Sequence, residues 1–156
     1  MVDKKDEGTV RRFRIDDTED INRILRDAFP WTKYETTFSI DSSEVAGTGR
    51  CFVFDTGNQV TGFVWALPDA VFGQSGYIRL VGIDESYRES GIGAVLMDRA
   101  EAYLSDRGRD VFLLVSAFNA NARGFYEHRG YERIGTIEGY VEKVIDEVLL
   151  RKQLLK

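Results

Sequence analysis

Cysteine is almost absent from this chain: Cys51 is the only one among 156 residues, so no disulfide can form within it. Such a chain is typical of a reducing compartment, and we expect a cytoplasmic protein. The opening stretch 1–7 is charged and lacks the apolar core of a secretory signal. No apolar run is long enough to cross a bilayer, so no membrane association is expected.

Positive charge is also in short supply. The chain has 21 Lys and Arg against 26 Asp and Glu, a formal net charge of −5, which argues against a general nucleic-acid binder. Histidine occurs once, at His128, between charged neighbours that indicate a solvent-facing helix position. No residues cluster at metal-ligand spacing, so no metal site is expected.

The remaining composition is that of an ordinary globular protein. Hydrophobic residues make up 43% and charged residues 30% of the chain. A length of 156 residues predicts one domain, 1–156, with a frayed polar start at 1–8. No internal repeats or low-complexity tracts are present.

The first half of the chain predicts short strands around two helical segments. Pro30 ends the helix that begins at Asp17 or Thr18. Between it and the next strand, 31–46 is irregular apart from a possible short helix at 41–47. Strands are predicted at 9–15, 51–54 and 59–67, with a hairpin turn at 55–58 and a loop at 68–76.

The second half predicts a strand, a long helix and a strand, which together form a right-handed βαβ unit with parallel strands. Asn119 or Asn121 caps a further short helix, which Gly130 ends. Gly139 indicates a turn or loop, and the end of the last segment is compatible with strand or helix. The predicted strands are 77–83, 111–116, 131–137 and 146–154, and the long helix begins at Ile92.

The junction between the first of these strands and the long helix has the composition of an anion site. It reads Arg88-Glu89-Ser90-Gly91-Ile92-Gly93. A turn into a helix N-terminus presents unpaired backbone N–H groups, and glycine allows an anion to approach them closely. The alternative is a simple tight turn. A P-loop sequence is absent, and a dinucleotide fingerprint would need glycine at Leu96.

Two motifs resemble those of one family. Arg88-x-x-Gly91-x-Gly93 resembles the Gln/Arg-x-x-Gly-x-Gly/Ala signature of the acetyl-CoA-dependent N-acetyltransferase superfamily (GNAT). The segment 119–131 is similar to a second family pattern, Asn-x-x-Ala-x-x-Phe-Tyr-x-x-x-Gly-Phe/Tyr, at every specified position. The resemblance covers about 9–154 and is specific between Val81 and Tyr131.

This resemblance implies an α+β fold of the GNAT acyl-CoA N-acyltransferase type, with a mixed, mostly antiparallel sheet and helices on both faces. The sheet would splay between 77–83 and 111–116, where acetyl-CoA, the acetyl donor, enters. One strand backbone would pair with the pantetheine arm, and the amides of the junction would hold the pyrophosphate. The implied cofactor-binding residues are Val81, Gly82, Ile83, Arg88, Glu89, Ser90, Gly91, Ile92, Gly93, Ala94, Asn119, Ala122 and Tyr126.

The reaction that the resemblance implies is direct acetyl transfer to a primary amine of a small molecule or a peptide. Tyr126 would be the catalytic residue, protonating the departing thiolate; alternatively it is only a core aromatic. Neither splayed strand contains a carboxylate, and Leu114 stands where some relatives carry glutamate. The general base is therefore open, with ordered water near Ser116 or Asp84 as one alternative.

The acceptor side of the site is expected in the segments 31–46 and 137–145. The candidate substrate residues are Trp31, Tyr34, Ser116 and Tyr140. Two rival functions remain: a catalytically inactive CoA-binding sensor, and an unrelated α/β domain that binds a phosphoryl group. The sequence leaves the acceptor and the oligomeric state open, and a homodimer is compatible with it.

Overall fold

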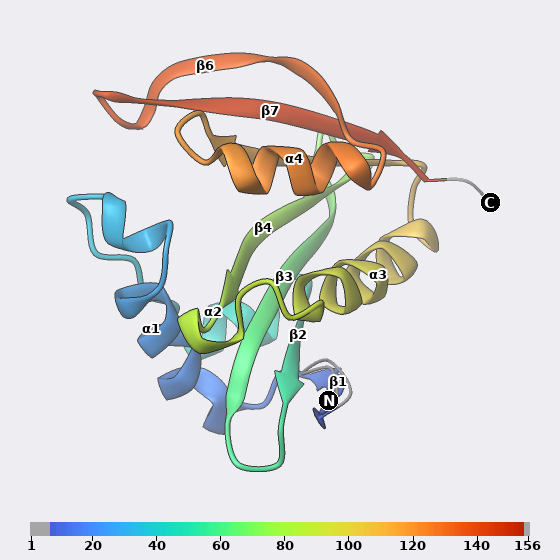
Figure 1. Cartoon of the computed structure of the whole chain (residues 1–156). Helices are drawn as coiled ribbons and strands as arrows, with labels where there is room; N and C mark the ends of the chain where they lie inside the picture. Colours follow the sequence, from blue (N-terminus) through green and yellow to red (C-terminus); the bar gives the residue numbers. More distant parts are fainter. Residues whose placement is uncertain (1–6, 155–156) are drawn as a thin grey trace.

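A computed structural model describes residues 7–154 of the chain (Figure 1). Within this range no helix has both the length and the apolar character needed to cross a membrane. The elements in chain order are β1 (Thr9–Arg12), η2 (Ile15–Asp17), α1 (Thr18–Asp27), η3 (Trp31–Lys33), α2 (Ser42–Gly47), β2 (Arg50–Asp55), β3 (Val60–Val71), β4 (Ser75–Ile83), η4 (Glu85–Tyr87), α3 (Ile92–Ser105), β5 (Asp110–Ser116), α4 (Ala120–His128), β6 (Glu132–Glu142) and β7 (Ile145–Gln153).

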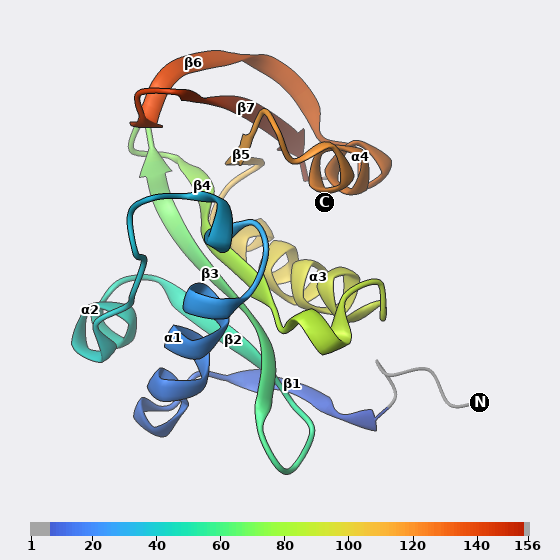
Figure 2. The ribbon, with the colours of Figure 1, turned by 60° about the vertical axis from the view of Figure 1, so that its left-hand side comes forward.

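The strands form one seven-stranded sheet in the order β1-β2-β3-β4-β5-β7-β6. Every neighbouring pair is antiparallel except β4 and β5, which are parallel and joined through α3. Helices α1 and α2 lie on one face of the sheet, and α3 and α4 lie on the other (Figure 2). The predicted mixed, mostly antiparallel sheet with helices on both faces is confirmed, as is the parallel βαβ unit.

The two central strands β4 and β5 separate part-way along their length. They pair only at Gly76–Val111, Tyr77–Phe112 and Ile78–Leu113. Beyond these pairs β4 continues to Ile83 and β5 continues to Ser116 without pairing to each other. The pairing of β4 with β3 shifts at the same place, between Ile78 and Leu80. A shift of this kind bends the strand that carries the extra residue, and it accompanies the opening of the sheet.

Two apolar cores hold the layers together. The core under α3 includes Phe54 and Val64 of the sheet, and the core under α1 includes Val53 and Phe63. Neighbouring residues of one strand thus serve opposite faces, because strand side chains alternate. Buried positions on the helices recur at three- and four-residue spacing: Ile21, Ile24 and Leu25 in α1, and Ile92, Leu96, Met97, Ala100 and Leu104 in α3.

Gly82 on β4 permits the close approach of α1 to the sheet. A Cβ at this position would lie 2.6 Å from Cε1 of Phe63 and 2.9 Å from Cγ2 of Ile24. Both neighbours are buried in a packed core. We expect Gly82→Ala to lower the free energy of unfolding by about 1–3 kcal/mol, measured by urea denaturation, because overpacking displaces the neighbours.

Gly135 on β6 provides the matched control for this substitution. A Cβ there would meet no atom within 4 Å, so Gly135→Ala adds a methyl group to a strand without a clash. Equal urea midpoints for the two variants would show that the contacts of Gly82 do not limit the packing of α1.

Several sequence-based boundaries are wrong. The predicted loop 68–76 is largely strand: β3 extends to Val71 and β4 begins at Ser75. The turn predicted at Gly139 lies inside β6, where Gly139 has a φ of 56° and the pairing with β7 is irregular. Glycines and a proline suggested turns, but both residue types also occur at strand irregularities and edges.

Three other expectations are settled as follows. The first strand ends at Arg12 and not at Ile15, because a short 3-10 helix begins there. The short helix at 41–47 is confirmed as α2, and the last segment is strand through Gln153. The expectation of a frayed start at 1–8 falls mostly outside the described residues, which begin at Glu7.

Candidate active site

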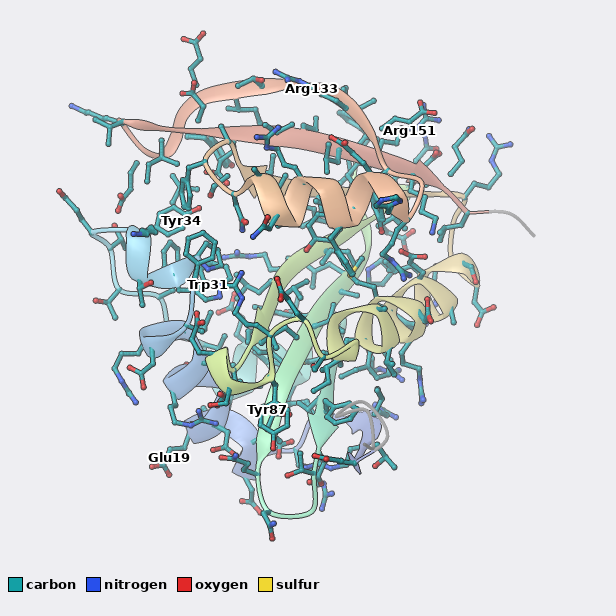
Figure 3. All side chains as sticks on the ribbon, viewed as in Figure 1. Glu19, Trp31, Tyr34, Tyr87, Arg133 and Arg151 are labelled. Carbon is teal, nitrogen blue, oxygen red and sulfur yellow. The ribbon has the colours of Figure 1, made fainter. Side chains whose placement is uncertain are left out.

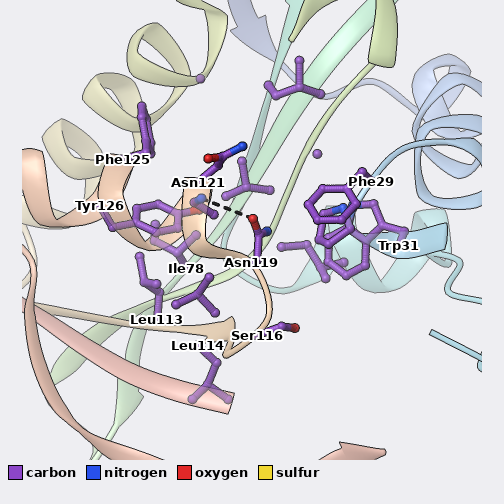
Figure 4. Close-up of a pocket in the computed structure, with 18 of the residues that line it drawn as sticks. Phe29, Trp31, Ile78, Leu113, Leu114, Ser116, Asn119, Asn121, Phe125 and Tyr126 are labelled. Carbon is purple, nitrogen blue, oxygen red and sulfur yellow. Dashed lines mark hydrogen bonds between the residues drawn. The ribbon is translucent and has the colours of Figure 1, made fainter. Parts of the chain in front are cut away.

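A cleft of about 810 Å³ occupies the opening between β4 and β5 (Figure 4). Its walls also include the N-terminal end of α3, one side of α4 and the segment between α1 and α2. Every predicted cofactor and substrate residue lines this cleft except Ile92. The side chain of Ile92 is fully buried in the core, so only its backbone belongs to the junction.

The junction at the start of α3 is shaped by left-handed backbone. Gly91 is the N-cap of α3 with a φ of 88°, and Glu89 has a φ of 59°. The Oγ of Ser90 accepts a hydrogen bond from the backbone N–H of Ile92 at 3.4 Å. No acidic side chain lies in the first turn of α3, so the positive end of its dipole is not neutralised there. These features fit a bound anion.

Arg88 lies beside this junction and connects it to the segment after α1. Its guanidinium is 3.5 Å from the carboxylate of Glu85 and lies over the ring of Phe29 at 4.9 Å. The backbone N–H of Phe29 donates to Glu85 at 2.6 Å. Arg88 is therefore held at the edge of the cleft by two contacts.

Asn119 is the residue that caps α4, which decides between the two asparagines suggested by the sequence. Its Oδ1 accepts the backbone N–H of Ala122 at 3.2 Å, the bond drawn in Figure 4. The side chain is 7% exposed and lines the cleft. With Oδ1 committed to the cap, the amide nitrogen is the group left for a ligand.

Tyr126 on α4 combines a packed ring with a hydroxyl at the cleft. Its ring contacts those of Phe125 and Tyr131, with centroids 5.2 and 5.7 Å apart. In Figure 4 the side chain points from α4 into the space that Asn119 also borders. Burial raises the pKa of Tyr126 to about 12, so its phenol stays protonated at neutral pH. It is both a core aromatic and a candidate proton donor.

Aromatic side chains wall the opposite end of the cleft. The rings of Trp31, Tyr34 and Phe38 lie 5.0–6.2 Å apart, and Tyr34 also contacts Phe118 at 6.0 Å. Trp31 and Tyr34 point inward from the segment that joins α1 to α2 (Figure 3). The segment 31–46 thus contributes residues to the cleft, as expected. Tyr140 borders it from β6 and is 63% exposed.

A buried carboxylate lies at this aromatic end. The register of β5 and β7 places Glu147 opposite Ser116. The Oγ of Ser116 donates to Oε2 of Glu147 at 3.1 Å, and the hydroxyl of Tyr34 lies 3.4 Å from the same oxygen. The hydroxyls of Tyr34 and Ser116 also contact each other. Glu147 is 4% exposed, and desolvation raises its pKa.

Comparison with known proteins decides the family. The model of the acetyltransferase (GNAT) family matches residues 18–131 of the chain. The chain belongs to the GNAT acetyltransferase family. A mycothiol acetyltransferase of Rhodococcus erythropolis is 31% identical to this GNAT chain over 139 residues, covering 80% of it and 46% of the relative. The chain spans about half or less of the length of the curated mycothiol acetyltransferases that it matches.

Solved GNAT structures share the fold at low sequence identity. Ard1 of Thermoplasma volcanium superposes with a TM-score of 0.78 at 21% identity, covering 96% of this chain and 99% of that one. NAA60 of Arabidopsis thaliana, solved with acetyl-CoA, gives a TM-score of 0.76 at 22% identity, covering 94% and 98%. These likenesses support the fold of this family member.

Glu147 is the residue of this GNAT site that sequence reasoning missed. The family resemblance pointed to a glutamate on one of the two splayed strands, and these strands contain no carboxylate lining the cleft. Glu147 lies on β7, the strand that neighbours β5 in the sheet, and this neighbourhood is set by the strand order. Asp84, one of the suggested contacts for a water, instead pairs with Arg23 at 2.5 Å and does not line the cleft.

Proposed function

We propose that this GNAT family member transfers the acetyl group of acetyl-CoA directly to a primary amine of a small molecule or a peptide. The observation that carries the proposal is one continuous cleft. It runs from the amides at the start of α3, through the opening between β4 and β5, to the buried carboxylate of Glu147. Such a cleft suits an extended donor whose reactive end meets an acceptor from the other side.

The residues at the first end suit the donor. The backbone of 88–94 would hold the pyrophosphate through N–H groups at the α3 N-terminus, with Arg88 adjacent. The unpaired edge of β4 at Val81, Gly82 and Ile83 would bind the pantetheine arm as an added strand does. Asn119 and Ala122 border its path. When bound, acetyl-CoA supplies an activated thioester.

The residues in the middle suit the transfer step. A backbone N–H near Ile83 would stabilise negative charge on the carbonyl oxygen. Tyr126, protonated at neutral pH, would give its proton to the departing sulfur. These roles are the ones that the family resemblance suggests, and the geometry of the cleft supports them.

A CoA-binding sensor without activity is the rival function. Its main support in the sequence was the missing carboxylate, and Glu147 at the acceptor end removes that reason. A thermal melt with acetyl-CoA, combined with thiol release across a panel of primary amines, tests the proposal. We expect acetyl-CoA at about 100 times its Kd to stabilise the fold by about 2.7 kcal/mol, with thiol release that depends on the amine.

Each rival has a distinct result in these two assays. Stabilisation by acetyl-CoA without amine-dependent thiol release would leave the sensor. If acetyl-CoA neither stabilises the protein nor releases thiol with any amine, the proposed function is overturned, and binding of an unrelated phosphoryl group in this cleft is the alternative that is left.

A further inference from the structure

We propose that Glu147 is the acceptor-binding base of this enzyme: it binds the amine as an ammonium ion and then removes its proton. Ser116 and Tyr34 are positioning residues that orient its carboxylate. The inference rests on the proposed function and adds to it the charge state of the acceptor and the group that activates it.

The first argument is where Glu147 lies relative to the proposed acid. Val115 and Val148 form a pair between β5 and β7 and belong to the core against which α4 packs. Ser116 and Glu147, one residue further along each strand, therefore project from the other face of the sheet. Tyr126 stands on the α4 side of the opening. Acid and base thus face the opening from opposite sides, as an attacking amine and a departing sulfur require.

The second argument is the cost of leaving Glu147 without a cation. A buried carboxylate is normally paired, since desolvation strongly disfavours an isolated charge. Glu101, the comparable buried glutamate of this chain, contacts Lys152 at 2.7 Å, Arg129 at 3.2 Å and the hydroxyl of Tyr131 at 2.9 Å.

Glu147 has no such partner. Within residues 7–154 it forms no salt bridge, and its hydrogen bonds come from the two hydroxyls of Ser116 and Tyr34. No lysine or arginine of the described residues therefore lies within contact distance of this carboxylate, and Glu147 lines the cleft. A primary ammonium group supplies a positive charge and three hydrogen-bond donors.

The surroundings of Glu147 favour a base rather than a permanent anion. Burial and the charge of Asp146 raise its pKa, and the hydrogen bonds from Ser116 and Tyr34 oppose the rise. A carboxylate with a raised pKa is a better proton acceptor near neutral pH. The other titratable groups that face this end of the cleft are Tyr77, Arg79 and Tyr140.

Every proton of the transfer step has a donor and an acceptor. The ammonium gives one proton to a carboxylate oxygen of Glu147, and the freed lone pair forms the new C–N bond at the thioester carbonyl carbon. As the C–S bond breaks, its electron pair leaves with sulfur, which takes the hydroxyl proton of Tyr126. The second proton of the nitrogen returns through water to the Tyr126 oxygen. The products are an amide, a thiol and one proton, which Glu147 releases to solvent.

Glu147→Gln tests the proposal, because the amide keeps the shape and cannot take the proton. We expect kcat/KM for an alkylamine at pH 7 to fall about 100-fold or more, with unchanged affinity for acetyl-CoA. The wild-type kcat/KM should form a plateau between the pKa of Glu147 and that of the amine, with an acid limb below it. The kcat/KM of the variant should rise about tenfold per pH unit up to the pKa of the amine, because only neutral amine then reacts. Glu138→Gln on β6, an exposed glutamate outside the cleft, is the matched control.

Ser116→Ala tests whether Ser116 orients the carboxylate of Glu147 or contributes only to the stability of the fold. Loss of its hydrogen bond should raise the pKa of Glu147 further, so the acid limb of the kcat/KM profile should move to higher pH. Calorimetry measures the affinity of the protein–CoA complex for an alkylammonium ion. This affinity should be lower in Glu147→Gln and unchanged in Glu138→Gln.

The outcomes distinguish this inference from the proposed function. Wild-type thiol release together with an unchanged pH profile and unchanged amine binding in Glu147→Gln overturns the role of Glu147 and leaves the acetyltransferase intact. A wild-type protein that acetylates no amine overturns both.

Discussion

Gly91→Glu is expected to weaken acetyl-CoA binding by at least about 100-fold, equivalent to roughly 2.7 kcal/mol. Gly91 caps α3 in the left-handed region with a φ of 88°, at the place where the junction lines the cleft. A side chain there fills the proposed pyrophosphate site, and its carboxylate repels the phosphates. Titration calorimetry with acetyl-CoA measures the effect.

Gly57→Glu is the control that separates backbone strain from loss of the site. Gly57 has a φ of 93° in the turn between β2 and β3, and a Cβ there would meet no atom within 4 Å. Both variants therefore carry the left-handed cost of about 1–2 kcal/mol and the same added charge. Equal acetyl-CoA affinity in the two variants would remove the junction of α3 from the donor site.

Tyr126→Phe is expected to lower kcat about 100-fold while leaving the affinity for acetyl-CoA within about twofold of wild type. The substitution keeps the ring that packs on Phe125 and Tyr131 and removes only the hydroxyl at the cleft. Steady-state thiol release against amine concentration, with calorimetry of acetyl-CoA binding, gives both numbers.

The pH dependence of kcat provides a second test of the role of Tyr126. Because the pKa of Tyr126 is raised to about 12, its proton is present at all ordinary assay pH values and is lost only above that value. A fall in kcat between pH 8 and 10 should therefore not come from this residue. Tyr103→Phe on α3, outside the cleft, is the matched control. Full activity of Tyr126→Phe across pH would exclude the acid role.

Much of the proposed donor site could be named from the sequence because its residues are close together in the chain. Arg88, Gly91 and Gly93 lie in one turn, and Asn119 to Tyr131 form one helix and its end. A helix N-terminus, a left-handed glycine and an asparagine cap are local structures, so their spacing in the sequence already determines their geometry.

The acceptor side was only partly predictable. Trp31, Tyr34 and Ser116 were expected near the substrate, but nothing in the sequence joined them into one cluster. The contacts of Tyr34 and Ser116 with Glu147 join residues far apart in the chain, since Tyr34 and Ser116 alone are separated by 82 positions. The pairing of distant segments is decided by how the whole apolar surface is buried, which no short motif records.

The amino-acid sequence by itself determined the family motifs and the βαβ unit, since each follows from local spacing and alternation, and the family resemblance made Tyr126 the proton-donor candidate. Only the tertiary structure decided that β7 inserts between β5 and β6, and this order brings Glu147 beside Ser116. Strand order sets which residues become neighbours across a sheet, and it results from the packing of the entire chain. The proposed base therefore came from the fold, while the proposed donor site came from the sequence.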